Sequence, residues 1–85
     1  MELERRPYHH KTYVKVRADF DFDGKIIPIK FRTEDSEAIT IDKIMDIRQA
    51  AALKSGGQGT RYTCRVGDQM LYLFHDRLSW FVELC

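Results

Sequence analysis

Cys64 and His75 are the side chains whose chemistry could combine a nucleophile with a general base. Cys64 shares its strand face with Tyr62 and Val66, a position typical of a small buried hydrophobe. A reactive cysteine needs an electropositive and partly open setting instead. The sequence offers no paired carboxylates and no triad-like set beyond this pair. We therefore expect no enzymatic activity, no small-molecule substrate and no cofactor.

The run Asp19-Phe20-Asp21-Phe22-Asp23-Gly24 places carboxylates and a glycine as the start of a calcium-binding EF-hand loop does. The position for the final bidentate glutamate is Lys30, and the alternation of this stretch predicts a strand. The neighbouring His9 and His10 are a poor pair for one ion, and the two cysteines lack metal-type spacing. We expect no metal site.

Glycines are concentrated between residues 55 and 60, at Gly56, Gly57 and Gly59. Successive backbone N–H groups in such a loop can hold an anion. The phosphate-binding pattern in which Lys and Ser/Thr follow the last glycine is absent. The alternative is a loop that needs positive φ angles where the chain reverses. Both interpretations stay open.

Cations recur at outward positions of several expected strands, with one aromatic among them. Basic residues around an exposed aromatic on a curved sheet are typical of single-stranded nucleic-acid binding. The alternative is the charged, solvated face of any soluble sheet, since carboxylates bring the net charge to only +1. The candidate nucleic-acid site consists of Tyr13, Lys15, Arg17, Lys30, Arg32, Arg61 and Arg65.

Apolar residues also fall on outward parity, at Ile26, Pro28 and Phe81. Surplus apolar surface on so small a chain indicates that a partner covers it. The function we favour is a non-catalytic protein-interaction or self-associating module, such as a homodimer. Single-stranded nucleic-acid binding is the alternative.

Period-two alternation predicts an all-β fold. Residues 11–22 and 25–33 alternate and flank Asp23-Gly24, which predicts a hairpin with a two-residue type I′ turn. Pro28 lacks a donor and predicts an edge or a bulge. Residues 38–41, 60–66, 70–74 and 78–84 continue the pattern, and 70–74 is apolar on both faces, as in a covered central strand. We predict an antiparallel meander of about six strands, coiled into a small, partly open barrel.

The stretch from 42 to 55 has two interpretations. Ile44, Met45 and Ile47 cannot share one strand face, so either a bulge near Asp42-Lys43 resets the register or a short helix begins. The alanine-rich run 49–54 has high helix propensity. We predict a strand to about Ile47 followed by one or two helical turns.

The expected core follows from the inward parity of these strands. It consists of Val14, Val16, Phe20, Ile27, Ile29, Phe31, Ile39, Ile41, Tyr62, Cys64, Val66, Tyr72, Phe74, Trp80 and Val82.

Length and composition set the remaining expectations. The 85 residues predict one small β domain over 11–85, preceded by a flexible arm over 1–10. No apolar run is long enough for a membrane helix, and the polar start does not resemble a signal peptide. Two cysteines without a disulfide framework favour a cytoplasmic location.

Several runs resemble a family of small uncharacterised bacterial proteins: 44–48, 56–65, 72–74 and 80–82. The resemblance covers residues 12 to 84. It implies a compact β domain of bacterial origin and offers no catalytic or binding residues to transfer.

Overall fold

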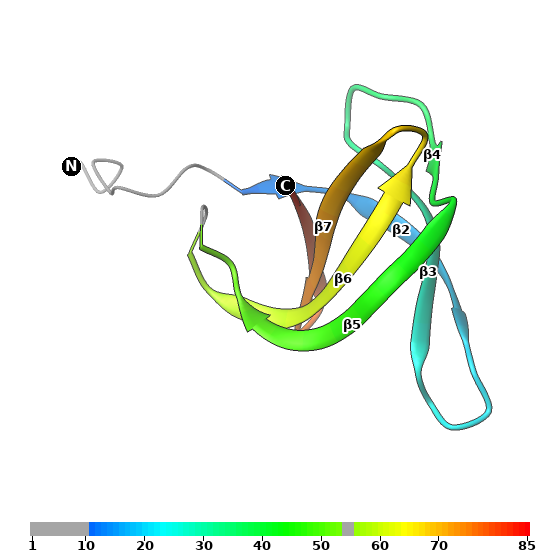
Figure 1. Cartoon of the computed structure of the whole chain (residues 1–85), viewed down its shortest axis with the longest axis vertical. Coiled ribbons are helices and arrows are strands. Elements are labelled where there is room, and N and C mark those ends of the chain that lie inside the picture. Colours follow the sequence, from blue (N-terminus) through cyan, green and yellow to red (C-terminus); the bar gives the residue numbers. More distant parts are fainter. Residues whose placement is uncertain (1–10, 54–55) are drawn as a thin grey trace.

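The computed structural model describes residues 11–53 and 56–85, and these form eight β-strands and no helix. All strand pairs are antiparallel, which confirms the predicted all-β class (Figure 1). One sheet has five strands in the order β1-β8-β7-β6-β5, and the other has three in the order β2-β3-β4. The strands are β1 (Thr12–Tyr13), β2 (Lys15–Phe20), β3 (Ile26–Arg32), β4 (Ile39–Thr40), β5 (Lys43–Ala51), β6 (Gln58–Val66), β7 (Gln69–Asp76) and β8 (Ser79–Leu84).

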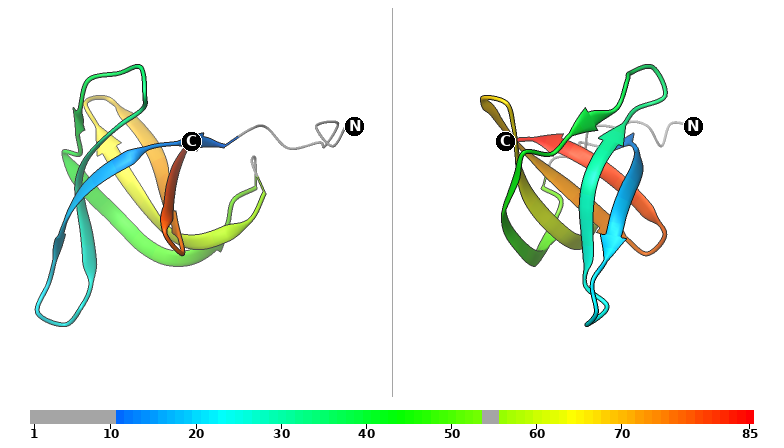
Figure 2. Two further views of the ribbon diagram at one scale, coloured as in Figure 1. Left: turned by 180° about the vertical axis from the view of Figure 1, so that it is seen from behind. Right: turned by 90° about the vertical axis from the view of Figure 1, so that its right-hand side faces the viewer.

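Two of the six predicted strands each pass from one sheet to the other, which accounts for the count of eight. The first gives β1 and β2, and the N–H of Val14 between them donates to Trp80 O at 3.0 Å. The second gives β4 and β5, where Ile41 still bonds to β3 and Asp42 already bonds to β6. Beyond Val14, β2 pairs with β3 and no longer with β8, so the two sheets do not close into a barrel (Figure 2).

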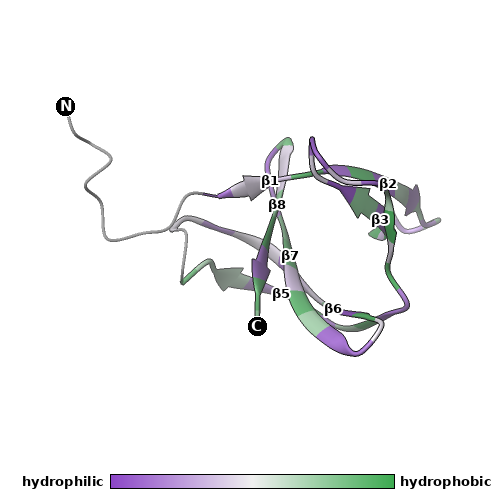
Figure 3. Ribbon diagram, turned by 90° about the horizontal axis from the view of Figure 1, so that it is seen from above, coloured by the Kyte–Doolittle hydropathy of each residue, from purple (hydrophilic) through white to green (hydrophobic). Residues whose placement is uncertain are grey.

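Figure 3 shows β2 and β3 across from β5, β6 and β7. The main core lies between the two sheets. Phe31 of β3 packs against buried residues of β6 and β7, namely Tyr62, Cys64, Leu71 and Leu73. The Tyr62 hydroxyl donates to the carbonyl of Ile26 at 2.7 Å and so ties β6 to β3. The partly buried residues around this cluster are Val14, Val16, Ile39, Ile41, Ile44, Val66, Trp80 and Val82.

A second cluster covers the opposite face of the five-stranded sheet. Phe74 and Phe81 stack with ring centroids 5.0 Å apart, beside Tyr72 and the buried Ala52. Leu71 and Leu73 are buried on the other face, so the prediction that β7 is covered on both sides is confirmed. The outward placement of Phe81 is wrong, because this side chain is only 1% exposed.

The predicted helix after Ile47 is wrong, because β5 continues to Ala51. Ile44 pairs with Cys64 and Asp46 with Thr63, which leaves Met45 as an extra residue. The break in alternation is therefore a β-bulge, placed at Met45 and not near residues 42–43.

A second bulge explains the misplaced residues of β3. Arg17 pairs with Lys30 and Ala18 with Pro28, so Ile29 is the extra residue. The shift in register leaves the Ile29 side chain 36% exposed and turns Pro28 inward, where its side chain is fully buried. The bulge predicted from Pro28 is confirmed, whereas its outward orientation and the burial of Ile29 are wrong.

The predicted hairpin between β2 and β3 is present, but its turn differs. Asp21 N–H donates to Lys25 O, so the loop spans three residues, and Gly24 has a φ of +87° while Asp23 is not in the positive-φ region. Three-residue loops with glycine in the left-handed conformation are a common alternative to the type I′ turn. Phe20, predicted to be buried, is 74% exposed near the end of this hairpin.

Candidate functional site

The free edge of β2 is one of the sheet edges that are open to a further strand, and β1, β4 and β5 are the other outer strands. Among the described residues, β2 pairs only with β3. Backbone groups alternate in direction along an antiparallel strand. Asp21 bonds to the β3 side and Val14 bonds to the β8 side. The N–H and C=O groups of Val16, Ala18 and Phe20 therefore point away from β3, toward the open edge.

A groove of about 590 Å³ runs along this edge and reaches the end of the β7–β8 hairpin. Apolar and basic residues alternate along its β2 wall. Because neighbouring residues of a strand point to opposite sides, Val16, Ala18 and Phe20 point to the side of the core, and Lys15 and Arg17 point to the outer face. Within the part of the chain that the structure describes, its charged lining is cationic and includes no carboxylate. The lining residues are Lys15, Val16, Arg17, Ala18, Phe20, Ile26, Lys30, Phe31, Arg32, Ala38, His75 and Trp80.

An aromatic pair forms the far wall of the groove. His75 and Trp80 are opposite each other on β7 and β8, and their rings stack at 4.1 Å and 9°. Trp80 also lies 5.7 Å from the ring of Tyr62, which fixes it to the core. Sequence reasoning assigned Trp80 to the core and considered His75 only as the candidate base for Cys64, with no catalysis expected. Their equal spacing from the turn at Arg77-Leu78 is the signal that would have paired them.

Four of the predicted nucleic-acid-binding residues come together at this groove. Lys15 is opposite Arg32, and Arg17 is opposite Lys30. Like charges directly opposite on neighbouring strands are unfavourable. An anionic ligand in the groove would relieve this repulsion.

Arg61 and Arg65 do not join the other predicted residues. Their neighbours Tyr62 and Cys64 face the core, so by alternation both arginines face away from it, on the five-stranded sheet. The Arg61 guanidinium lies 4.4 Å from the centre of the Tyr72 ring. Asp46 is close to this surface.

Asp46 compensates part of the positive charge there. It accepts a hydrogen bond of 2.6 Å from Arg48 Nε. This bond, with the charges of Arg48 and Arg61, lowers the pKa of the Asp46 carboxyl. The same bond and the Asp46 charge raise the pKa of Arg48. The arginine face therefore differs from the groove, which has no carboxylate lining.

Tyr13 lies apart from both basic regions. Its ring meets Phe81 edge-on at 6.2 Å, and it lines a separate depression with Lys11 and Gly57. Lys11 Nζ lies 5.0 Å from the centre of the Phe81 ring. Tyr13, expected to be a stacking platform beside Lys15, pairs with Phe81. Its ring is therefore on the face of the five-stranded sheet opposite to that of Val14 and Trp80.

The local backbone explains why glycine is required at Gly56, Gly57 and Gly59. Gly56 and Gly57 have φ angles of +82° and +88°. The Gly56 N–H donates to Ala52 O, so it points into the turn. Gly59 lies in β6, where an added Cβ would be 2.5 Å from the carbonyl oxygen of His75. These features favour a chain reversal with close strand contact, and anion binding there stays a prediction.

The Cys64 thiol is not activated. It is fully buried, and burial raises its pKa to about 11, with a smaller contribution from Cys85. Its Sγ lies 3.5 Å from the carbonyl of Tyr62, within hydrogen-bond distance. His75 is stacked on Trp80, and Cys64 is opposite Leu71 and not His75. The thiol is therefore protonated at neutral pH.

Within residues 11–53 and 56–85, no group of three or more potential ligands could hold a metal ion. The Asp21 and Asp23 carboxylates accept backbone bonds in the hairpin loop. The histidines at 9 and 10 and the arm predicted over 1–10 lie outside the described residues. The same described ranges contain no helix that could cross a membrane.

A comparison with known proteins finds no matching family model, no matching curated protein and no matching solved structure. The resemblance to small bacterial β domains therefore stays a prediction.

Proposed function

We propose that the protein is a non-catalytic protein-interaction module that binds an extended segment of a partner at the free edge of β2. The observation that carries this proposal is the coincidence of an unpaired strand edge with a groove whose charged lining is entirely cationic. Addition of a strand to a sheet edge gives affinity through backbone bonds and specificity through alternate side chains. The free thiol of the exposed Cys85 fits the expected cytoplasmic setting.

The chemistry of the edge defines the partner segment. Val16, Ala18 and Phe20 would bond to its backbone. Lys15 and Arg17 flank these positions on the outer face and favour carboxylates opposite them. Asp19 and Asp21 lie further along the same face and disfavour carboxylates opposite them. The partner is therefore a strand with apolar inward residues, with aspartate or glutamate opposite Lys15 and Arg17 and without carboxylates opposite Asp19 and Asp21.

A proline at position 18 tests the proposal, because Ala18 directs its N–H to the free edge. Ala18 is opposite Pro28, which has no N–H of its own to bond back. Ala18→Pro should therefore block strand addition while β2 keeps its bonds to β3. Ala18→Ser keeps the N–H and is the matched control.

The measurement is fluorescence polarisation of a labelled aspartate–valine peptide at nanomolar protein. The peptide has aspartate opposite Lys15 and Arg17, threonine opposite Asp19 and Asp21, and valine between these positions. We expect binding by the wild type and Ala18→Ser, and at least tenfold weaker binding by Ala18→Pro and by Lys15→Ala with Arg17→Ala. Circular dichroism checks that each variant is folded. Binding that ignores both changes would refute the proposed site.

The second candidate function is binding of single-stranded nucleic acid in the same groove. It is favoured by the two opposed cation pairs on the outer face of the β2–β3 hairpin, which border the groove that also contains the stacked His75 and Trp80 rings. Phosphate contacts release counterions, so affinity should fall steeply with salt. A labelled random single strand should then lose affinity with Lys30→Ala and Arg32→Ala, whereas Arg61→Ala with Arg65→Ala is the control on the other sheet. No binding at low salt would eliminate this candidate.

A further inference from the structure

We propose that the strand added at this edge is β2 of a second copy of the chain, paired antiparallel about a two-fold axis at Ala18. The two three-stranded sheets would then form one continuous six-stranded sheet. This inference rests on the proposed function, since it names the partner for the same edge. It is carried by the sequence of the edge, Lys15-Val16-Arg17-Ala18-Asp19-Phe20-Asp21.

The backbone restricts the registers that two such edges can adopt. In an antiparallel pair, two residues directly opposite each other either both direct their N–H and C=O groups to the partner strand or both direct them away. Each residue whose backbone groups point to the free edge must therefore face another such residue. On this edge the bonded residues are Val16, Ala18 and Phe20. A slip by one residue would place a residue whose backbone points to the free edge opposite one whose backbone already bonds to β3. The remaining registers are therefore centred on 16, 17, 18, 19 or 20.

Charge selects among these registers. Centring on Ala18 places Arg17 opposite Asp19 of the second copy, and Lys15 opposite Asp21 of the second copy. The two-fold axis repeats each pair, so four cation–carboxylate pairs form on one face. Centring on 17 would place Arg17 opposite itself, and centring on 19 would place Asp19 opposite itself. Centring on 16 would place Lys15 opposite Arg17, and centring on 20 would place Asp19 opposite Asp21. Opposite charges across strands are favourable and like charges are not, so Ala18 is the preferred centre.

The apolar face agrees with the same register. It places Phe20 of each copy opposite Val16 of the other. Phe20 is 74% exposed in the single chain, although its parity is that of the core face. Val16 lines the groove with Trp80 and His75. The pairing therefore brings the exposed ring against an apolar wall that the single chain leaves open.

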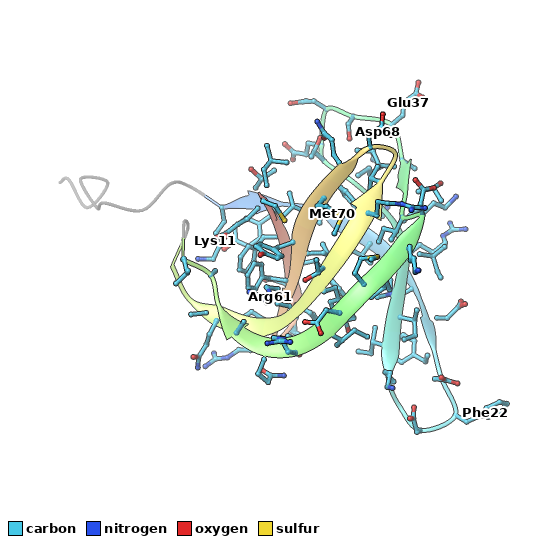
Figure 4. All side chains as sticks on the ribbon, in the orientation of Figure 1. Lys11, Phe22, Glu37, Arg61, Asp68 and Met70 are labelled. Atoms are coloured by element: carbon cyan, nitrogen blue, oxygen red, sulfur yellow. The ribbon has the colours of Figure 1, made fainter. Side chains whose placement is uncertain are left out.

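The hairpin that carries this edge extends away from the body of the fold, with Phe22 at its end (Figure 4). In the antiparallel arrangement each hairpin would run toward the basic end of the other. There the carboxylates of the second copy would also meet the cations of β3, since Lys15 and Arg17 are opposite Arg32 and Lys30. Like-charge repulsion within each copy would thereby be reduced.

Charge reversal with rescue tests the register. Arg17→Asp places carboxylates opposite Asp19 of the second copy, twice per dimer, and should weaken dimerisation about tenfold or more. Asp19→Arg alone should do the same. The double variant Arg17→Asp with Asp19→Arg restores opposite charges in each pair and should recover the wild-type dimer. Arg65→Glu, an exposed charge reversal on the five-stranded sheet, is the control and should have no effect.

Sedimentation velocity from micromolar to high micromolar protein measures the equilibrium. A second variant, Ala18→Cys in a Cys85→Ser background, should form a disulfide between copies because residue 18 faces itself across the axis. Arg17→Cys in that background should not. A monomeric wild type, or single reversals that the double variant does not rescue, would overturn the inference. The proposed function would survive if the aspartate–valine peptide still bound and Ala18→Pro abolished that binding.

Discussion

The burial of Cys64 in the core predicts that the protein loses stability at alkaline pH. The side chain is 0% exposed between the sheets. Burial disfavours the thiolate and raises the pKa of the thiol from 9.0 to about 11, with a smaller contribution from Cys85. The perturbation is a rise in pH from 7 to 10, applied to the wild type and to Cys64→Ala.

The sign follows from proton binding in the two states. The unfolded chain releases the thiol proton near pH 9.0, and the folded chain holds it to about pH 11. Between these values the unfolded state binds fewer protons, so the free energy of unfolding falls as pH rises. The stabilisation by the protonated thiol is fully present well below pH 9.0. The free energy of unfolding is lower by about 1.4 kcal/mol at pH 10, and the loss approaches ~2.7 kcal/mol above pH 11.

Urea unfolding at pH 7 and pH 10 measures this difference. Cys64→Ala leaves a cavity that lowers stability at both pH values, so only the change with pH is compared. The wild type should lose about 1.4 kcal/mol more than Cys64→Ala. Burial, with a smaller contribution from Cys64, also raises the pKa of Tyr62, and the loss of stability that is due to burial occurs in both proteins. Cys85→Ser should behave as the wild type. Equal losses in wild type and Cys64→Ala would refute the reasoning.

Three further substitutions test the packing. Tyr62→Phe removes the 2.7 Å hydrogen bond to Ile26 O and should lower the free energy of unfolding by about 1–2 kcal/mol, measured in urea. Gly59→Ala places a Cβ 2.5 Å from His75 O, so we expect a thermal midpoint well below that of the wild type and a changed amide spectrum at the β6–β7 end. Phe74→Ala empties the stack on Phe81 and should cost about 3–5 kcal/mol by chemical denaturation. A wild-type midpoint in any of these variants contradicts the packing described.

The strands could be predicted from sequence because their alternation is long and regular. Each of the eight strands overlaps one of the six predicted extended segments, since a segment that bends between two sheets keeps its alternation through the bend. The bends at Val14 and at Ile41-Asp42 depend on which neighbour each strand meets. That information is not local, so the division into two sheets could not be read from the segments.

The predicted helix shows where local propensity is overridden. Residues 49–51 favour helix by composition, yet they pair with residues 58–60 of β6. Each pairing adds interstrand backbone bonds that outweigh a preference of a few tenths of a kcal/mol per residue. The bulge at Met45 removed the alternation that would have revealed the continuing strand.

The candidate site was predicted in part. Parity correctly placed Lys15, Arg17, Lys30 and Arg32 on one sheet, because a hairpin fixes which residues are neighbours. Parity gives two faces to every strand and does not say which sheet a distant strand joins. Arg61 and Arg65 therefore fell on a different surface, and Tyr13 fell beside Phe81.

Phe20 was predicted to be buried and is exposed, whereas Phe81 was predicted to face outward and is buried. The reason for this difference bears on the proposed role of the free edge. Phe81 lies on β8, an interior strand of the five-stranded sheet, where Phe74 and Ala52 cover the second face. Phe20 lies near the end of a hairpin that extends past the main core. An exposed apolar edge invites pairing with any strand, and charges on the edge limit that risk. Asp19 and Asp21 flank Phe20 and would oppose carboxylates in most added strands, whereas a strand with cations at those positions is favoured. In the proposed pairing, the charges that limit unspecific strand addition at this edge would thus be the same ones that select a partner with the sequence pattern of β2 itself.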